Sequence, residues 1–78
     1  MADSKAAPNI TGPWLKVDDS ENHLEVAETA QRGLFSVRST FDPSRMIYAT
    51  ARQIQALTYQ ANAPQSEVGQ LIQSGLRA

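Results

Sequence analysis

The sequence predicts a small α+β domain, in which a three-stranded antiparallel β-meander packs with one or two C-terminal helices. Three observations lead to this prediction. Short β-type runs occur at residues 23–28, 34–39 and 45–49, and the first two alternate between apolar and polar side chains. Short polar segments separate the runs. A capped helical pattern then follows the third run.

Three units are expected along the chain. Residues 1–12 are small or polar and offer little apolar surface to bury, so a disordered N-terminal tail is expected. The α+β module is expected over residues 13–62, and Trp14 is its first large apolar side chain. Residues 63–78 are expected to form a C-terminal helical extension.

The strand prediction rests on the period of two. In the first run Leu24 and Val26 share one face, and in the second run Phe35 and Val37 do the same. A turn is expected at Asp42-Pro43-Ser44, because proline presets φ at the second turn position and aspartate can bond the backbone ahead. Strands joined by such short connections favour an antiparallel meander.

The first helix is expected over residues 51–62. Thr50 and Gln53 have the spacing of a capping box, in which each side chain bonds the backbone N–H of the other residue. Pro64 disfavours helical geometry at the residue before it, so the helix should end near Asn62. Its apolar stripe consists of Ala51, Ile54, Leu57, Thr58 and Ala61.

A second helical pattern covers residues 65–77. Gly69 and Gly75 weaken it, each by about 1 kcal/mol relative to alanine in a helix interior. The helix therefore needs a surface to dock on. Two alternatives remain open: it packs on its own sheet, or it binds a partner protein. The apolar positions concerned are Val68, Leu71 and Ile72.

The predicted core is small. A chain of 78 residues without cysteine buries a limited apolar area and has no disulfide to add stability. Self-association through open strand edges is the remaining route, so a homodimer or small homo-oligomer is expected. The predicted core residues are Trp14, Leu24, Val26, Phe35, Val37, Ile47, Ile54 and Leu57.

The composition argues against several function classes. The net charge is −1, with seven Lys or Arg against eight Asp or Glu, which is not typical of a nucleic-acid-binding domain. His23 is the single histidine, and no phosphate-binding loop or metal-ligand spacing is present. We therefore predict a non-enzymatic protein with no cofactor and no metal. The N-terminus lacks an apolar signal segment and no run is long enough to span a membrane, so a cytoplasmic protein is expected.

Arginines spaced along the module form a second candidate surface. Arg32, Arg38, Arg45 and Arg52 could align and contact phosphates or an acidic partner, although on a near-neutral protein such residues also make up an ordinary solvated face. Together with the helix stripe, they give the candidate partner-binding residues Arg38, Arg45, Arg52, Val68, Leu71 and Ile72.

Several short motifs point to one family. The segment W-L-K at residues 14–16 is similar to W-R-K-S-S, and N-H-L-E-V-A at 22–27 to N-C-V-E-V-A. F-S-V-R-S-T-F-D-P at 35–43 partly matches V-x-V-R-D-S-K-D-P, and Y-A-T-A-R-Q-I at 48–54 stands where F-T-P-A-E-W leads a helix. Over about 45 residues the chain thus resembles the actinobacterial family called domain of unknown function 397, which includes the streptomycete developmental regulator Bld-B.

This resemblance implies a regulatory role. Members of the family commonly occur beside XRE-type helix-turn-helix regulators and are thought to bind them, in developmental or antibiotic-production control or as toxin–antitoxin-like pairs. The expected function is therefore protein–protein association with such a regulator. Two alternatives remain, which are direct nucleic-acid binding through the arginines and a small structural or assembly protein.

Overall fold

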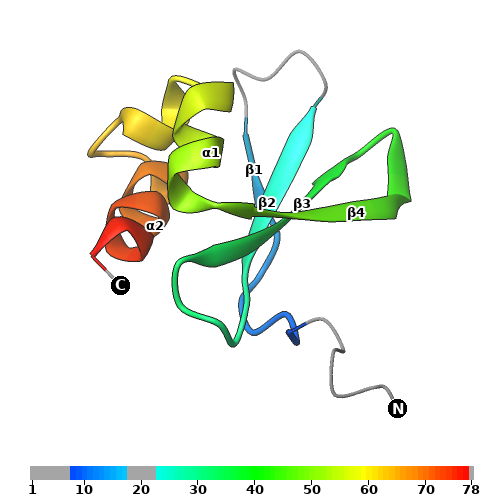
Figure 1. Cartoon of the computed structure of the whole chain (residues 1–78). Helices are drawn as coiled ribbons and strands as arrows, with labels where there is room; N and C mark the ends of the chain where they lie inside the picture. The colour runs from blue at the N-terminus through cyan, green and yellow to red at the C-terminus, as the bar shows by residue number, and fades with distance from the viewer. Residues whose placement is uncertain (1–7, 18–22, 78) are drawn as a thin grey trace.

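In this computed structural model, residues 8–17 and 23–77 are described, and they fold as an antiparallel sheet with helices on one side (Figure 1). The sheet has four strands in the order β1-β2-β3-β4. The α+β class and the antiparallel meander are confirmed, but the prediction of three strands is one too few. The elements are β1 (Leu15–Lys16), β2 (Leu24–Glu28), β3 (Leu34–Ser39), β4 (Asp42–Thr50), α1 (Ala51–Leu57), the 3-10 turn η2 (Gln60–Asn62) and α2 (Glu67–Leu76).

The additional strand comes from the segment around Trp14. Leu15 of β1 pairs with Val26 of β2. Further back along the chain, Ile10 forms an isolated antiparallel bridge with Thr29. Part of the segment predicted to be a disordered tail therefore pairs with the sheet, because its backbone groups meet the free edge of β2. The rest of that prediction, for residues 1–7, lies outside the described residues.

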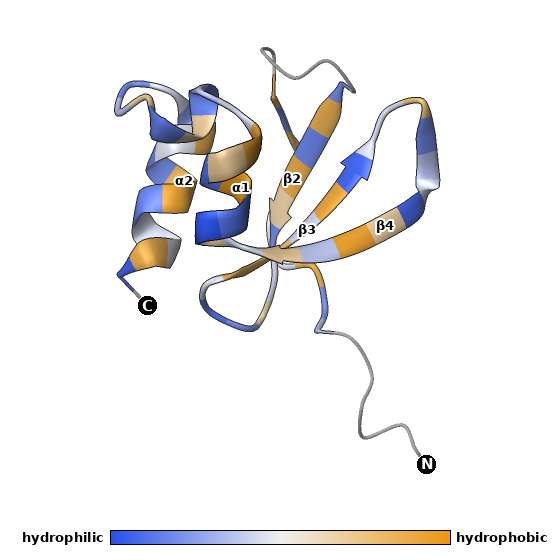
Figure 2. Cartoon of the chain, turned by 45° about the horizontal axis from the view of Figure 1, so that its top comes forward, coloured by the Kyte–Doolittle hydropathy of each residue, from blue (hydrophilic) through white to orange (hydrophobic). Residues whose placement is uncertain are grey.

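The predicted alternation places the core correctly. Val26 pairs with Val37, so both side chains point to the same face of the sheet. Phe35 lies two residues from Val37 on the same strand, so it points to this face too. Helices α1 and α2 lie beside the sheet (Figure 2). The buried apolar residues are Val17, Val26, Ala27, Phe35, Val37, Ala49, Ala51, Ile54, Ala61, Val68 and Ile72.

The predicted Asp42-Pro43-Ser44 turn is wrong, because the chain turns earlier, over residues 40–41. The Ser39 hydroxyl accepts a hydrogen bond from the N–H of Phe41 at 3.1 Å, which favours the earlier turn. Residues 43–45 then form a bulge with no partners on β3. The pairs that flank this bulge are Ser39 with Asp42 and Arg38 with Met46. Proline is tolerated there because β4 is an edge strand.

The capping box at the start of α1 is confirmed. The Thr50 hydroxyl accepts from the N–H of Gln53 at 3.3 Å, and the Gln53 side chain accepts from the N–H of Thr50 at 2.8 Å. The helix is shorter than predicted, because it ends at Leu57 and Thr58 takes an extended conformation. The side-chain amide of Asn62 donates to the Gln55 and Thr58 carbonyls, which satisfies the end of the helix.

Two predicted core residues, Ile47 and Leu57, are exposed at 61% and 55%. Ile47 pairs with Val37, and both side chains point to the core face of the sheet. Ile47 lies on the outermost strand, however, where the helices leave it exposed. The buried positions of the helix stripe include Ile54, Thr58 and Ala61, which leaves Leu57 to one side. Trp14 and Leu24 are half-buried.

Helix α2 packs on its own domain, against α1, η2 and β1. Its two glycines permit this close approach. A Cβ on Gly69 would lie 1.9 Å from the carbonyl oxygen of Ala63, and a Cβ on Gly75 would lie 2.6 Å from Cζ of Phe35. The residues that weaken the helix in isolation are therefore the ones that allow it to dock. The Ser66 hydroxyl caps α2 by accepting from the N–H of Gly69 at 2.8 Å.

Candidate functional site

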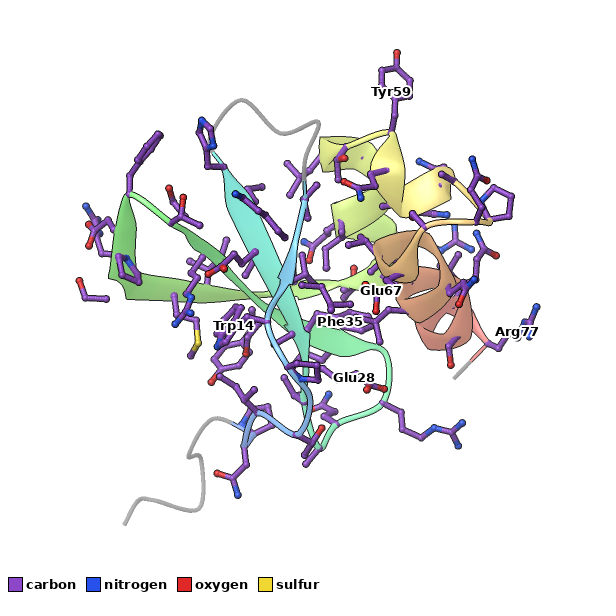
Figure 3. All side chains as sticks on the ribbon, turned by 180° about the vertical axis from the view of Figure 1, so that it is seen from behind. Trp14, Glu28, Phe35, Tyr59, Glu67 and Arg77 are labelled. Atoms are coloured by element: carbon purple, nitrogen blue, oxygen red, sulfur yellow. The ribbon has the colours of Figure 1, made fainter. Side chains whose placement is uncertain are left out.

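The most exposed aromatic side chain among the described residues lies just after α1. Tyr59 is 88% exposed and points away from the body of the molecule (Figure 3). Leu57, two residues earlier, is the other large apolar side chain exposed there. We call the region around them the α1-end surface, defined by Gln55, Ala56, Leu57, Thr58, Tyr59 and Asn62.

Hydrogen bonds fix the backbone under this surface. The Thr58 hydroxyl accepts from the N–H of Gln60 at 3.1 Å. The Asn62 amide donates to the carbonyls of Gln55 and Thr58 at 3.3 and 3.4 Å. Thr58 itself is buried, so it anchors the segment to the core. Leu57 and Tyr59 therefore project from a backbone that hydrogen bonds already fix. This reduces the conformational entropy that is lost when a partner binds through them.

A shallow depression of about 370 Å³ is lined by the residues of the α1-end surface. Its side chains are apolar or neutral and polar, and none of them carries a charge. Such a lining can take an apolar side chain and offer hydrogen bonds at its rim. These are features that protein-binding surfaces commonly have.

A second exposed apolar region lies on the β3–β4 hairpin. Phe41 at the turn is exposed and makes an edge-on ring contact with His23, with ring centroids 4.7 Å apart. Ile47 follows further along β4. The β3–β4 hairpin, which carries these side chains, extends away from α2 (Figure 1). They form a surface separate from the α1-end surface.

The candidate arginines are not brought to one face. Arg38 is half-buried, and its guanidinium stacks 3.9 Å above the ring of Trp14 and pairs with Glu25 at 2.9 Å. Its register places it on the sheet face opposite the one that carries Val37 and the helices. Arg52 lies on α1, which covers that other face, and Arg45 lies in the bulge of β4. Arg38 therefore has a structural role, while the other two are exposed.

The candidate stripe on α2 divides in two. Val68 and Ile72 are buried in the domain's own core, so in this conformation they are not available to a partner. Leu71 is partly buried and packs against the same core. It also lines a groove of about 320 Å³ between the N-terminal segment and α2. Of the three positions, Leu71 is the one that a partner can reach.

Two features are absent from the described residues. Within residues 8–17 and 23–77 there is no group of three His, Cys, Asp or Glu side chains placed to hold a metal ion. No described helix has the length and apolar character needed to cross a membrane.

Sequence reasoning missed Tyr59 and Phe41. Tyr59 lay inside a predicted helix, and the local signal against that helix was the β-branched Thr58 followed by an asparagine able to bond back to the preceding carbonyls. Phe41 fell between the run at 34–39 and the turn predicted at Asp42-Pro43-Ser44 and was assigned no role, although Ser39 two residues earlier is a residue type that stabilises such turns.

Comparisons with protein-family models, curated proteins and solved structures give no match for this chain.

Proposed function

We propose that this chain is a small non-enzymatic regulatory protein that acts in the cytoplasm by protein–protein association. The observation that carries the proposal is the α1-end surface, where Leu57 and Tyr59 are exposed over a shallow uncharged depression. Tyrosine is enriched at binding hot spots, because it contributes a large contact area with few rotatable bonds. A held backbone beneath such side chains favours recognition of a partner.

The partner in this proposal is an XRE-type helix-turn-helix regulator. This part of the proposal rests on the resemblance of residues 14–59 to the domain of unknown function 397 family, whose members are thought to bind such regulators. An amphipathic helix of the regulator would place an apolar side chain into the depression beside Tyr59. Contact through this helix would regulate the partner in developmental or antibiotic-production control, or in a toxin–antitoxin-like pair.

The test is titration calorimetry with a helix-turn-helix regulator encoded beside the gene for this chain, which is the kind of partner that the resemblance implies. Tyr59→Ala is expected to weaken binding by about tenfold or more, which corresponds to the loss of a hot-spot side chain. Phe41→Ala is the matched control, since it removes another strongly exposed aromatic side chain, 75% exposed, from the β3–β4 hairpin. Unfolding temperatures of both variants should match the parent, because neither side chain is buried.

Two outcomes would contradict the proposal. One is equal binding by the Tyr59→Ala variant and the parent, which would move the interface elsewhere. The other is absence of any complex with the regulator combined with DNA binding that weakens steeply with salt, which would favour the nucleic-acid alternative.

A further inference from the structure

The outer edge of β4 is the long open edge of the described sheet. β4 is an outermost strand of nine residues, and no described strand pairs with its outer side (Figure 1). The opposite edge is formed by β1, which has two residues. A long edge strand with an exposed apolar residue presents unpaired backbone groups to another strand. Which strand can pair here depends on the backbone N–H and C=O groups that this edge exposes.

The alternation of hydrogen-bonded and non-hydrogen-bonded pairs between β3 and β4 identifies the backbone groups that point outward. The N–H of Ala51 donates to the carbonyl of Gly33 at 3.3 Å. In an antiparallel ladder, hydrogen-bonded and non-hydrogen-bonded pairs alternate, so the neighbouring pair is of the second kind. The pairs of this second kind are Leu34 with Thr50, Ser36 with Tyr48 and Arg38 with Met46. On β4 their N–H and C=O groups point away from β3, to the outer edge.

At both ends of this open edge, the backbone is unavailable for pairing with another strand. The N–H of Thr50 points outward but is already bonded to the Gln53 side chain at 2.8 Å. At the other end, the bulge at residues 43–45 breaks the strand, and Pro43 has no N–H to offer. The outward backbone groups of the straight segment between them belong to Met46 and Tyr48.

We propose that a second copy of this chain pairs with β4 in antiparallel orientation across a two-fold axis at Ile47. In this register Met46 of one copy faces Tyr48 of the other. Each such pair exchanges two backbone hydrogen bonds, so the two symmetric pairs make four. The register uses every outward group of the open segment. A register centred on Tyr48 would instead place Met46 opposite Thr50, whose N–H is already bonded.

The side chains fit the same register. Ile47, which is 61% exposed in the single chain, meets Ile47 of the second copy as a non-hydrogen-bonded pair, the kind in which side chains approach most closely. On the other face Met46 lies across from the ring of Tyr48, a favourable sulfur–aromatic contact. Arg45 falls opposite Ala49, so no like charges face each other. This self-complementarity argues for a second copy as the occupant.

The dimer is independent of the proposed regulatory function. It uses β4, whereas the regulator is proposed to bind the α1-end surface, so either interaction can fail without the other. In the dimer, two α1-end surfaces are related by the two-fold axis, and the assembly can hold two copies of a partner.

The test is charge substitution at the axis, with the dissociation constant measured by analytical ultracentrifugation. Ile47→Lys and Ile47→Glu each place like charges against each other, so each variant alone is expected to dissociate at concentrations about tenfold higher or more. An equimolar mixture of the two variants is expected to form a heterodimer, because the charges become opposite. Leu57→Lys is the control, since it changes an equally exposed apolar residue on the α1-end surface.

A second experiment locates the axis. The chain has no cysteine, so Ile47→Cys introduces its only thiol. Directly opposed residues of a non-hydrogen-bonded pair have Cα atoms about 4.5 Å apart, within the range of a disulfide. Mild oxidation should give a covalent dimer much faster than it does with Leu57→Cys.

Three results would overturn the proposal. The first is a parent chain that stays monomeric at all concentrations, even if it captures an extended peptide of another protein. The second is a dimer that the charged variants and their mixture leave unchanged. The third is equal rates of disulfide formation for the two cysteine variants.

Discussion

The ring of Phe35 occupies the space that a side chain at Gly75 would need, since a Cβ there would lie 2.6 Å from Phe35 Cζ (Figure 3 shows Phe35). Gly75→Ala is therefore expected to lower the free energy of unfolding, because overpacking costs about 1–3 kcal/mol and exceeds the helix-propensity gain of about 1 kcal/mol. Urea denaturation measures the difference. Ser74→Ala, on the exposed side of α2, is the control and should be neutral or slightly stabilising.

Gly69→Ala should be more damaging than Gly75→Ala. The atom that its Cβ would meet, at 1.9 Å, is the backbone carbonyl oxygen of Ala63, which cannot rotate away as a ring can. We expect a larger fall in melting temperature, at roughly 4–8 °C per kcal/mol for a domain of this size. Thermal unfolding followed by circular dichroism gives the ranking, and the reverse order would mean that α2 does not pack on the segment before it.

Docking of α2 on its own domain predicts a contrast between neighbouring residues. Ile72→Ala empties a fully buried position and should cost about 2–5 kcal/mol. Leu71→Ala should cost less, because Leu71 is only partly buried. Denaturant titration of both variants tests this contrast. Equal and small losses would show that α2 is not part of the folded core in solution.

Arg38 makes two interactions of different kinds, and salt should separate them. Its ion pair with Glu25 should weaken in 1 M salt, whereas stacking on Trp14 should change less. Double-mutant cycles with Arg38→Gln, Glu25→Gln and Trp14→Leu measure the two couplings, each expected to be about 0.5–1 kcal/mol. A Trp14 coupling that disappeared with salt would argue against the stacked geometry.

Asn62 connects stability to the α1-end surface. Asn62→Asp removes the donor that reaches the carbonyls of Gln55 and Thr58 and places a carboxylate against them. The expected loss is about 1 kcal/mol of stability, together with weaker regulator binding. Gln65→Glu introduces the same charge at a nearby exposed position and is the control. Unchanged binding by the Asn62 variant would separate this surface from the interface.

The parts of the fold that local sequence determines were predictable. The capping box of Thr50 and Gln53 depends on a spacing of three residues, and the facing of Val26 and Val37 depends on a period of two. Exposure is different, because it depends on which strand is outermost. Ile47 alternates like a core residue and points to the core face, yet none of the described helices covers it, and it is 61% exposed.

The candidate site was less predictable for the same reason. Tyr59 is exposed because the chain leaves the helix at Thr58, where the side-chain amide of Asn62, four residues later, donates a hydrogen bond to the Thr58 carbonyl. Arginine is a residue type that often binds partners, which made Arg38 a candidate. Its actual neighbours, Glu25 and Trp14, lie in other segments of the sequence and meet Arg38 only in the folded chain. Sequence patterns indicate residue types well and long-range neighbours poorly.

The bulge at residues 43–45 has a consequence for solubility and for changes in chain length. Without these three residues, the pair of Ser39 with Asp42 would run directly into the pair of Arg38 with Met46, and the hairpin would be regular. Its outer edge would then be longer and flatter, which favours uncontrolled fibre-like stacking of many chains. The bulge therefore limits how far another strand can pair along β4. It is also the point where an insertion would leave the register of β3 and β4 unchanged.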